Sequence, residues 1–127
     1  MAGKVTIKFG QILYAEDDIT YQMTTPRILA RIGFEVKVVG NGQLAVDAFK
    51  ENSRYASVLL DNQMPILTGL EAARRILEQK TVDIVLFTSD EKKDVCEKID
   101  DLGIRYLQKP SSESGFRILY ASLLERR

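Results

Sequence analysis

Histidine is absent from this sequence, and there is only one cysteine, Cys96. Without histidine, catalysis by Ser-His or Cys-His pairs and metal sites built on imidazole are excluded. A single cysteine excludes an internal disulfide and is typical of a protein in a reducing compartment. The chemistry available to this chain therefore rests on carboxylates, hydroxyls and lysines.

Excess charge of either sign and long apolar runs are also missing. The 18 basic residues balance 18 acidic residues, so neither nucleic acid nor anionic lipid is expected as a direct partner. No apolar run approaches the roughly 20 residues that span a bilayer, and the first ten residues lack the apolar segment of a secretory signal. With 127 residues, we expect a single cytoplasmic domain that covers positions 1–127 and does not bind a membrane.

Strand-like and helix-like segments alternate along the whole chain. Continuous or alternating apolar residues predict five strands, at 11–15, 34–39, 57–61, 83–88 and 104–108. Apolar residues at helical spacing predict five helices, around 19–32, 44–49, 70–79, 91–102 and 116–124. Residues 1–9 are expected either to extend the first strand or to be disordered. Pro26 lies inside the first helix, where we expect it to kink or shorten the segment.

Five strand–helix units in succession predict a parallel sheet with helices on both faces. The strands at 11–15, 57–61 and 83–88 are continuously apolar, as expected for central strands that are buried on both sides. The other two strands belong at the edges because they carry polar residues, namely Glu35, Lys37, Arg105 and Gln108. The predicted fold is therefore α/β and flavodoxin-like, a doubly wound five-stranded parallel sheet with strand order 2-1-3-4-5.

Polar and charged side chains lie at the carboxyl ends of the predicted strands, where sheets of this order bind ligands. They are Glu16, Asp17 and Asp18 after the first strand, Asp61 at the end of the third, Thr88, Ser89 and Asp90 at the fourth, and Lys109 after the fifth. Two carboxylates ~4 Å apart repel by about 4 kcal/mol at an effective dielectric constant of about 20, so a cation is expected among them. An all-oxygen acidic site that water can reach suits Mg²⁺.

Each of these side chains also has an ordinary structural explanation. Asp17, Asp18 or Thr20 can cap the helix that follows them, and residues 88–90 can cap the next one. Lys109, taken alone, is more often a solvated loop residue. The joint arrangement favours a functional site, because all these groups fall on one side of the predicted sheet.

Four segments, "ILYAEDD", "VLLDNQMPILTG", "LFTSD" and "YLQKP", resemble the signature segments of two-component response-regulator receiver domains. The resemblance extends from about Gln11 to Leu124 and implies that Asp61 is the phosphoacceptor. It also implies that Mg²⁺, or Mn²⁺ in its place, is bound by a set of oxygen ligands. These are Asp17, Asp61, the backbone carbonyl of Gln63, and Glu16 acting through water.

The resemblance further implies residues that respond to the phosphoryl group. Thr88 is implied as the switch hydroxyl, Lys109 as the lysine that contacts phosphate, and Tyr106 as the aromatic residue whose rotamer reports the state. Gln63 and Asp90, each two residues past a site residue, flank the path of attacking water. We expect these two side chains to tune the lifetime of the phosphoryl group.

The implied function is phosphorelay signalling rather than an enzyme activity of its own. The domain would accept a phosphoryl group from a histidine kinase or a histidine phosphotransfer protein. It would then signal to a protein bound at the face formed by residues 91–102, 104–108 and the last helix, as a monomer or a weak dimer. Two alternatives stay open: an interaction module or phosphate sink that does not switch, and a Mg²⁺-dependent phosphohydrolase. Haloacid-type phosphatases need an Asp where this chain has Gln63, which argues against the second.

Overall fold

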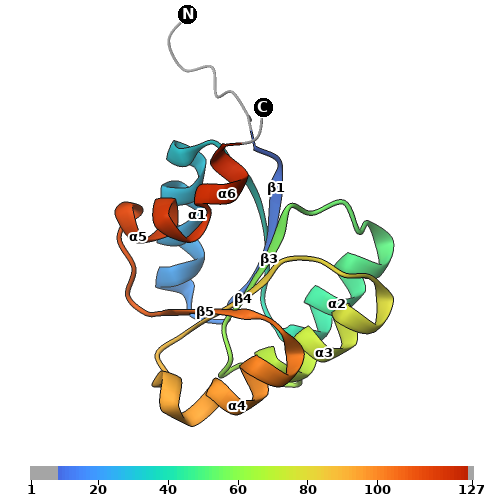
Figure 1. The fold of residues 1–127 in the computed structure, drawn as a ribbon. Coiled ribbons are helices and arrows are strands. Elements are labelled where there is room, and N and C mark those ends of the chain that lie inside the picture. The colour runs from blue at the N-terminus through green and yellow to red at the C-terminus, as the bar shows by residue number, and fades with distance from the viewer. Residues whose placement is uncertain (1–8, 126–127) are drawn as a thin grey trace, which may run out of the picture.

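The computed structural model describes residues 9–125 and contains one sheet of five parallel strands (Figure 1). The strands are β1 (Gln11–Ala15), β2 (Glu35–Val39), β3 (Ser57–Leu60), β4 (Ile84–Thr88) and β5 (Arg105–Gln108). Their order across the sheet is β2-β1-β3-β4-β5, and every neighbouring pair is parallel. This confirms the predicted strand order. The expectation for residues 1–9 falls, apart from Phe9, outside the described part of the chain.

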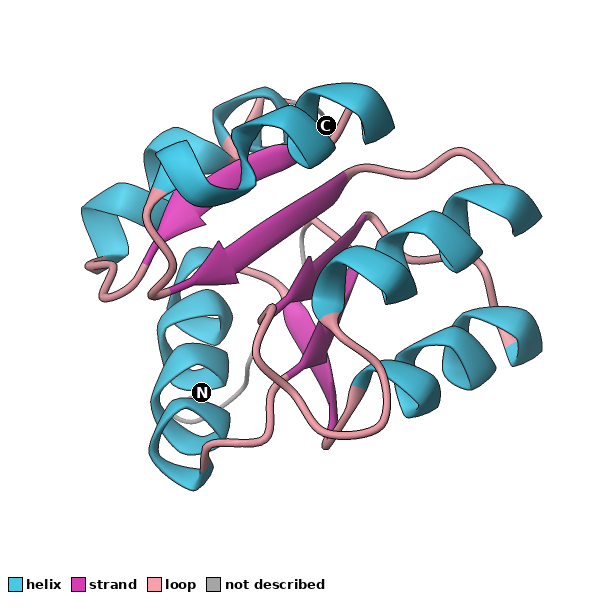
Figure 2. Ribbon diagram, turned by 90° about the horizontal axis from the view of Figure 1, so that it is seen from below, coloured by secondary structure: helices cyan, strands magenta, loops and turns pink. Residues whose placement is uncertain are grey.

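Helices cover both faces of the sheet, as the two views in Figures 1 and 2 show. Helices α1, α5 and α6 lie on one face, and α2, α3 and α4 lie on the other. Their bounds are α1 (Ile19–Ile32), α2 (Gly42–Glu51), α3 (Gly69–Gln79), α4 (Lys92–Leu102), α5 (Glu113–Leu119) and α6 (Ala121–Leu124). The doubly wound α/β class is therefore confirmed.

The central strands pack on both faces because consecutive side chains of a strand point in opposite directions. In β1, Ile12 and Tyr14 belong to the apolar cluster under α1 and α5, whereas Leu13 and Ala15 belong to the cluster under α2 and α3. All four side chains are fully buried. Full burial of a large apolar side chain contributes about 1.5–3 kcal/mol, so the continuous apolar runs make these strands the centre of the sheet.

Helix α1 differs from the expectation for Pro26. The helix is capped by Asp18, runs through Pro26 and ends at Gly33, so the proline does not shorten it. Leu29 and Ile32, which follow the proline, are buried on the sheet. Their packing compensates the backbone hydrogen bond that proline cannot make.

The C-terminal segment also differs, because the single helix expected around 116–124 is broken at Tyr120. This residue separates α5 from α6 with φ −102° and ψ 18°. Its side chain is fully buried, and its hydroxyl lies 3.1 Å from Ser57 Oγ. Arg105 donates to the carbonyl oxygen of Leu119 (2.5 Å), immediately before the break. These contacts with the sheet interrupt the helix where the sequence pattern alone continues it.

Candidate functional site

Three carboxylates meet at the carboxyl ends of β1 and β3. Ala15 of β1 is in register with Leu60 of β3, so the residues that follow them, Glu16 and Asp61, lie side by side. One carboxylate oxygen from each of Glu16, Asp17 and Asp61 lies within 4.8 Å of the other two. Glu16 and Asp61 are buried, whereas Asp17 is exposed. The described structure therefore brings together the acidic residues that the strand ends predict.

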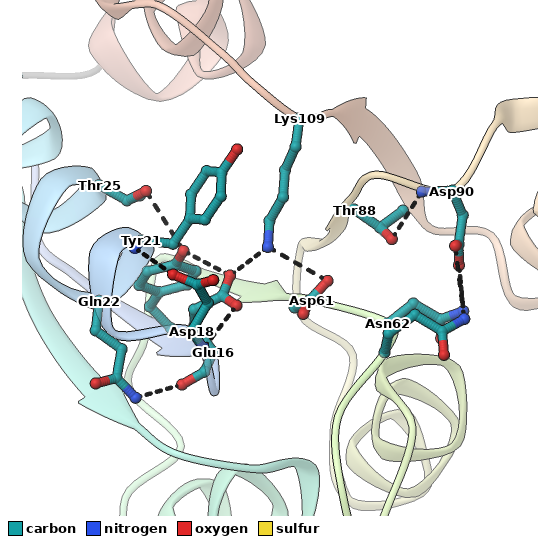
Figure 3. Close-up of polar contacts among 12 residues, drawn as sticks. Glu16, Asp18, Tyr21, Gln22, Thr25, Asp61, Asn62, Thr88, Asp90 and Lys109 are labelled. Carbon is teal, nitrogen blue, oxygen red and sulfur yellow. Dashed lines mark hydrogen bonds and ion pairs between the residues drawn. The ribbon is translucent and has the colours of Figure 1, made fainter.

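Lys109 enters this acidic group from the end of β5, as Figure 3 shows. Its Nζ lies 2.6 Å from Glu16 Oε1 and 3.5 Å from Asp61 Oδ1. The side chain is only 5% exposed, and its ammonium group lies 4.1 Å from the centre of the Tyr21 ring. The predicted convergence of this lysine with the carboxylates is present, but its closer partner is Glu16 rather than Asp61.

The ionisation of Asp61 is strongly affected by its surroundings. Burial, and then the negative charge of Glu16, raise the pKa of Asp61 to about 7, while the charge of Lys109 acts in the opposite direction. One lysine thus does not neutralise the buried carboxylates. A divalent cation bound to the same oxygens would relieve this repulsion.

Glu16 is held by donors on every side. Its Oε1 accepts from the Tyr14 hydroxyl (3.0 Å) as well as from Lys109, and its Oε2 accepts from the amide of Asp18 (3.2 Å). The side-chain amide of Gln22 donates to its backbone carbonyl (2.6 Å). Sequence reasoning missed Tyr14. The available signal was its position two residues before Glu16, which places both side chains on the same side of the extended chain.

The loop after β4 is bound to the loop after β3 through Asp90. The carboxylate of Asp90 accepts from Asn62 Nδ2 (2.9 Å) and from Gln63 Nε2 (3.2 Å). The amide of Asp90 donates to Thr88 Oγ1 (3.1 Å), and the Tyr106 hydroxyl donates to the Asp90 carbonyl (2.5 Å). Residues beside Asp61 are thereby connected to both predicted switch residues. Asn62 was not predicted, because nothing in its local sequence indicates a partner 28 positions away.

The simpler explanations for these residues have different outcomes. Asp18 does cap α1, since its Oδ1 accepts from the amides of Thr20 (2.9 Å) and Tyr21 (3.2 Å). Residues 88–90 do not cap α4, whose N-cap is Glu91 without a side-chain cap bond. Thr88 is buried at the end of β4, so its hydroxyl faces the loop rather than the helix end.

Gly69, the first residue of α3, fits tightly against the backbone of Asp61. A Cβ placed on this glycine would overlap the carbonyl oxygen of Asp61. Asn62 contributes to the same junction, since its Oδ1 accepts from the amide of Leu70 (3.1 Å). The start of α3 thus holds the loop that carries Asp61.

A second depression, of about 830 Å³, lies away from these carboxylates at the amino ends of β4 and β5. Its lining includes Arg105 and Asp83, which form an ion pair at 2.8 Å. Asp83 also accepts from Ser57 Oγ at 2.9 Å. The charges in this depression are therefore satisfied by one another, and we attribute them to the packing of α5 and α6.

None of the helices within residues 9–125 combines the length and the hydropathy needed to cross a membrane.

Comparison with known proteins gives a family match over most of the chain. The family model described as "Response regulator receiver domain" matches residues 12–119. The transcriptional regulatory protein PdtaR of Mycobacterium tuberculosis is 34% identical over 106 residues, which cover 82% of this chain and 51% of that protein. Hybrid signal transduction histidine kinase I of Dictyostelium discoideum is 32% identical over 110 residues, 79% of this chain and 6% of that protein. The chain thus spans about half, or much less, of the length of these relatives.

Solved structures give the same result. The receiver domain of a sensor histidine kinase from Pseudomonas aeruginosa PAO1, with a magnesium ion coordinated in the active site cleft, is 28% identical with a TM-score of 0.80. The match covers 91% of this chain and 98% of that one. A CheY-like receiver domain from Methylobacillus flagellatus superimposes with a TM-score of 0.82 at 24% identity, covering 91% of this chain and 99% of that one, and supports the fold.

Proposed function

Since the chain belongs to the response regulator receiver domain family of two-component signalling proteins, we propose that it accepts a phosphoryl group on Asp61 and signals by changing conformation. The observation that carries the proposal is the position of Asp61. It is a buried carboxylate at the carboxyl end of β3, 3.5 Å from a lysine and grouped with two further carboxylates. We infer that the donor is a phosphohistidine on a histidine kinase or a histidine phosphotransfer protein.

The proposed transfer makes one bond and breaks one. An oxygen of the Asp61 carboxylate bonds to phosphorus as the phosphorus–nitrogen bond of the donor breaks. The imidazole leaves with the bonding electron pair and ends with a proton on that nitrogen, and Asp61 becomes an acyl phosphate. Such transfers depend on positioning and on neutralising charge more than on acid–base catalysis. Lys109 is the side chain placed to follow the added negative charge.

The residues at this site fit Mg²⁺, because the cluster offers only oxygen ligands and one of its carboxylates is exposed to water. Asp17, Asp61 and the Gln63 carbonyl would hold the ion directly, with Glu16 acting through water. When bound, the ion supplies positive charge to the phosphoryl oxygens. Mn²⁺ is expected to replace it.

A protein donor is supported by the surface next to the site. Ile19 and Met23 on the first turns of α1 are 71% and 53% exposed, and Ile66 in the loop between β3 and α3 is 77% exposed. Large exposed apolar side chains beside a charged site are typical of contacts with a protein partner. We therefore place the donor on the rim formed by the start of α1 and the loop after β3.

Switching, rather than simple storage of phosphate, is supported by the contacts of Asp90. Its amide holds the Thr88 hydroxyl oxygen, and its carbonyl accepts from Tyr106. A Thr88 hydroxyl that turns toward a phosphoryl group gives up the contact with the Asp90 amide. The loop is then free to move relative to Tyr106, which changes the face formed by α4, β5 and α5. We propose that the output partner binds this face, and that Gln63 and Asp90 affect how long the phosphoryl group persists.

Acetyl phosphate with Mg²⁺ tests the assignment of Asp61. Intact mass spectrometry should show one labile phosphoryl adduct on the wild-type protein and none on Asp61→Asn. Asp18→Asn is the matched control, because asparagine keeps the cap of α1 and the substitution removes one carboxylate from the same rim. It should keep the adduct. An adduct that persists on Asp61→Asn would move the phosphoacceptor to another residue.

A further inference from the structure

Lys109 is stored on Glu16 in this structure. Its Nζ is 2.6 Å from Glu16 Oε1 but 3.5 Å from Asp61 Oδ1. If Asp61 carries a phosphoryl group, Lys109 must turn toward it, and Glu16 then loses its closest partner. Glu16 is fully buried, and a buried carboxylate that loses its ion-pair partner is strongly destabilising. The movement of Lys109 is therefore costly unless another donor stays on Glu16.

The Tyr14 hydroxyl is that donor. It lies 3.0 Å from Glu16 Oε1, the same oxygen that Lys109 contacts. On the other oxygen, Glu16 keeps the amide of Asp18. With both donors in place, the carboxylate retains a hydrogen bond on each oxygen when the lysine leaves.

We propose that Tyr14 is a positioning residue whose hydroxyl satisfies Glu16, so that Lys109 is released toward a phosphoryl group on Asp61. This inference rests on the proposed function of Asp61. It assigns to Tyr14 no contact with the reacting atoms.

The surroundings of Tyr14 hold its hydroxyl in place. The residue is fully buried in β1, and its ring packs against Phe87 at a centroid distance of 6.5 Å. The hydroxyl also lies 3.4 Å from Thr25 Oγ1 on α1, and Thr25 is itself buried. Burial raises the pKa of Tyr14, so the hydroxyl keeps its proton and stays a donor.

The rings around Lys109 ease its movement. Its ammonium group lies 4.1 Å from the centre of the Tyr21 ring and 5.5 Å from that of Phe87. A cation over aromatic faces is stabilised without a directional bond. Lys109 therefore keeps this part of its stabilisation in both positions, and the balance between Glu16 and Asp61 depends on what else binds Glu16.

Tyr14→Phe removes only the hydroxyl and tests the proposal without phosphoryl transfer. Dissociation constants of Mg²⁺ alone, and of beryllofluoride at saturating Mg²⁺, are measured by calorimetry. We expect the beryllofluoride constant to rise about tenfold, because a hydrogen bond to a charged group is lost when Lys109 turns. The Mg²⁺ constant should stay unchanged or fall, because Glu16 with one donor fewer competes more strongly for a cation.

Tyr120→Phe is the matched control. It removes another buried tyrosine hydroxyl, one that contacts Ser57 at the opposite end of the strands. It should lower the melting temperature and leave both dissociation constants at the wild-type values. Thr25→Val, which removes only the group that holds the Tyr14 hydroxyl, should weaken beryllofluoride binding about two- to threefold and provides the test if Tyr14→Phe does not fold.

The outcomes separate this inference from the proposed function. Wild-type protein that binds no beryllofluoride would remove Asp61 as phosphoacceptor, and the role of Tyr14 with it. Normal wild-type binding that is unchanged in Tyr14→Phe, or in Thr25→Val where only that variant folds, would overturn the role of Tyr14 alone. Equal weakening of Mg²⁺ and beryllofluoride binding would make Tyr14 a structural residue and would also overturn the inference.

Discussion

Replacing Asp61 with asparagine should stabilise the metal-free protein at neutral and alkaline pH, although it removes a proposed functional group. Burial and the charge of Glu16 raise the pKa of Asp61 from its ordinary value of 3.8 to about 7. The folded state therefore binds this proton more tightly than the unfolded state does. Asparagine has a similar shape and never ionises, so it avoids the cost of a buried charge.

The size of the effect follows from the difference between the two pKa values, which is about 3. Each pKa unit corresponds to about 1.4 kcal/mol, so the upper limit is about 4 kcal/mol above pH 7. Below about pH 4 the carboxyl group is neutral in both states, and the two proteins should be equally stable. Between about pH 4 and pH 7 the wild-type protein should lose stability relative to Asp61→Asn as the pH rises.

Urea denaturation with a chelator present, followed by far-ultraviolet circular dichroism, measures this difference at pH 4.5, 6 and 8. Circular dichroism is the suitable probe because the chain has no tryptophan. Equal denaturant slopes would show that only stability has changed. Asp47→Asn, on the exposed surface of α2, is the control and should follow the wild-type pH dependence. An Asp61→Asn protein that is less stable than wild type at pH 8 would refute the argument, since pairing with Lys109 would then outweigh burial.

Two further outcomes are expected. Mg²⁺ should raise the melting temperature of the wild-type protein by mass action, by the equivalent of about 2.7 kcal/mol at 100 times the dissociation constant, and Asp17→Asn should show a smaller rise; an equal rise in both proteins would remove Asp17 as a ligand. Beryllofluoride should shift amide NMR signals across residues 88–108, and Thr88→Ala should keep Mg²⁺ binding but reduce the shifts near Tyr106. Shifts confined to the immediate neighbours of Asp61 in the wild-type protein would favour a phosphate sink.

The order of the strands was predictable because burial on both sides of a parallel strand demands a continuous apolar run. The same logic placed Asp61 and Glu16 together, since residues that follow adjacent parallel strands share one edge of the sheet. The break at Tyr120 was not predictable, because helical spacing continues through it. It depends on contacts with Ser57 and Arg105, which the sequence places 63 and 15 residues away.

Individual side-chain partners at the site were harder to predict than its composition. That Lys109 approaches the carboxylates follows from topology, but its preference for Glu16 over Asp61 depends on rotamers and on the position of Tyr14. The bond between Asn62 and Asp90 joins two loops whose relative position only the folded chain defines. The roles assigned to these residues stay predictions for the experiments above.

The sheet separates two sets of contacts that begin at the same pair of carboxylates. Through Tyr14 and Thr25, Glu16 is connected to α1, whereas the residue after Asp61 is connected through Asp90 to Tyr106 on the opposite side. A phosphodonor seated on the start of α1 would therefore leave the α4 side accessible. We expect that a donor and an output protein can occupy this domain at the same time. Signal output then need not wait for the donor to dissociate, and the two proteins would compete for the phosphoryl group rather than for the same surface.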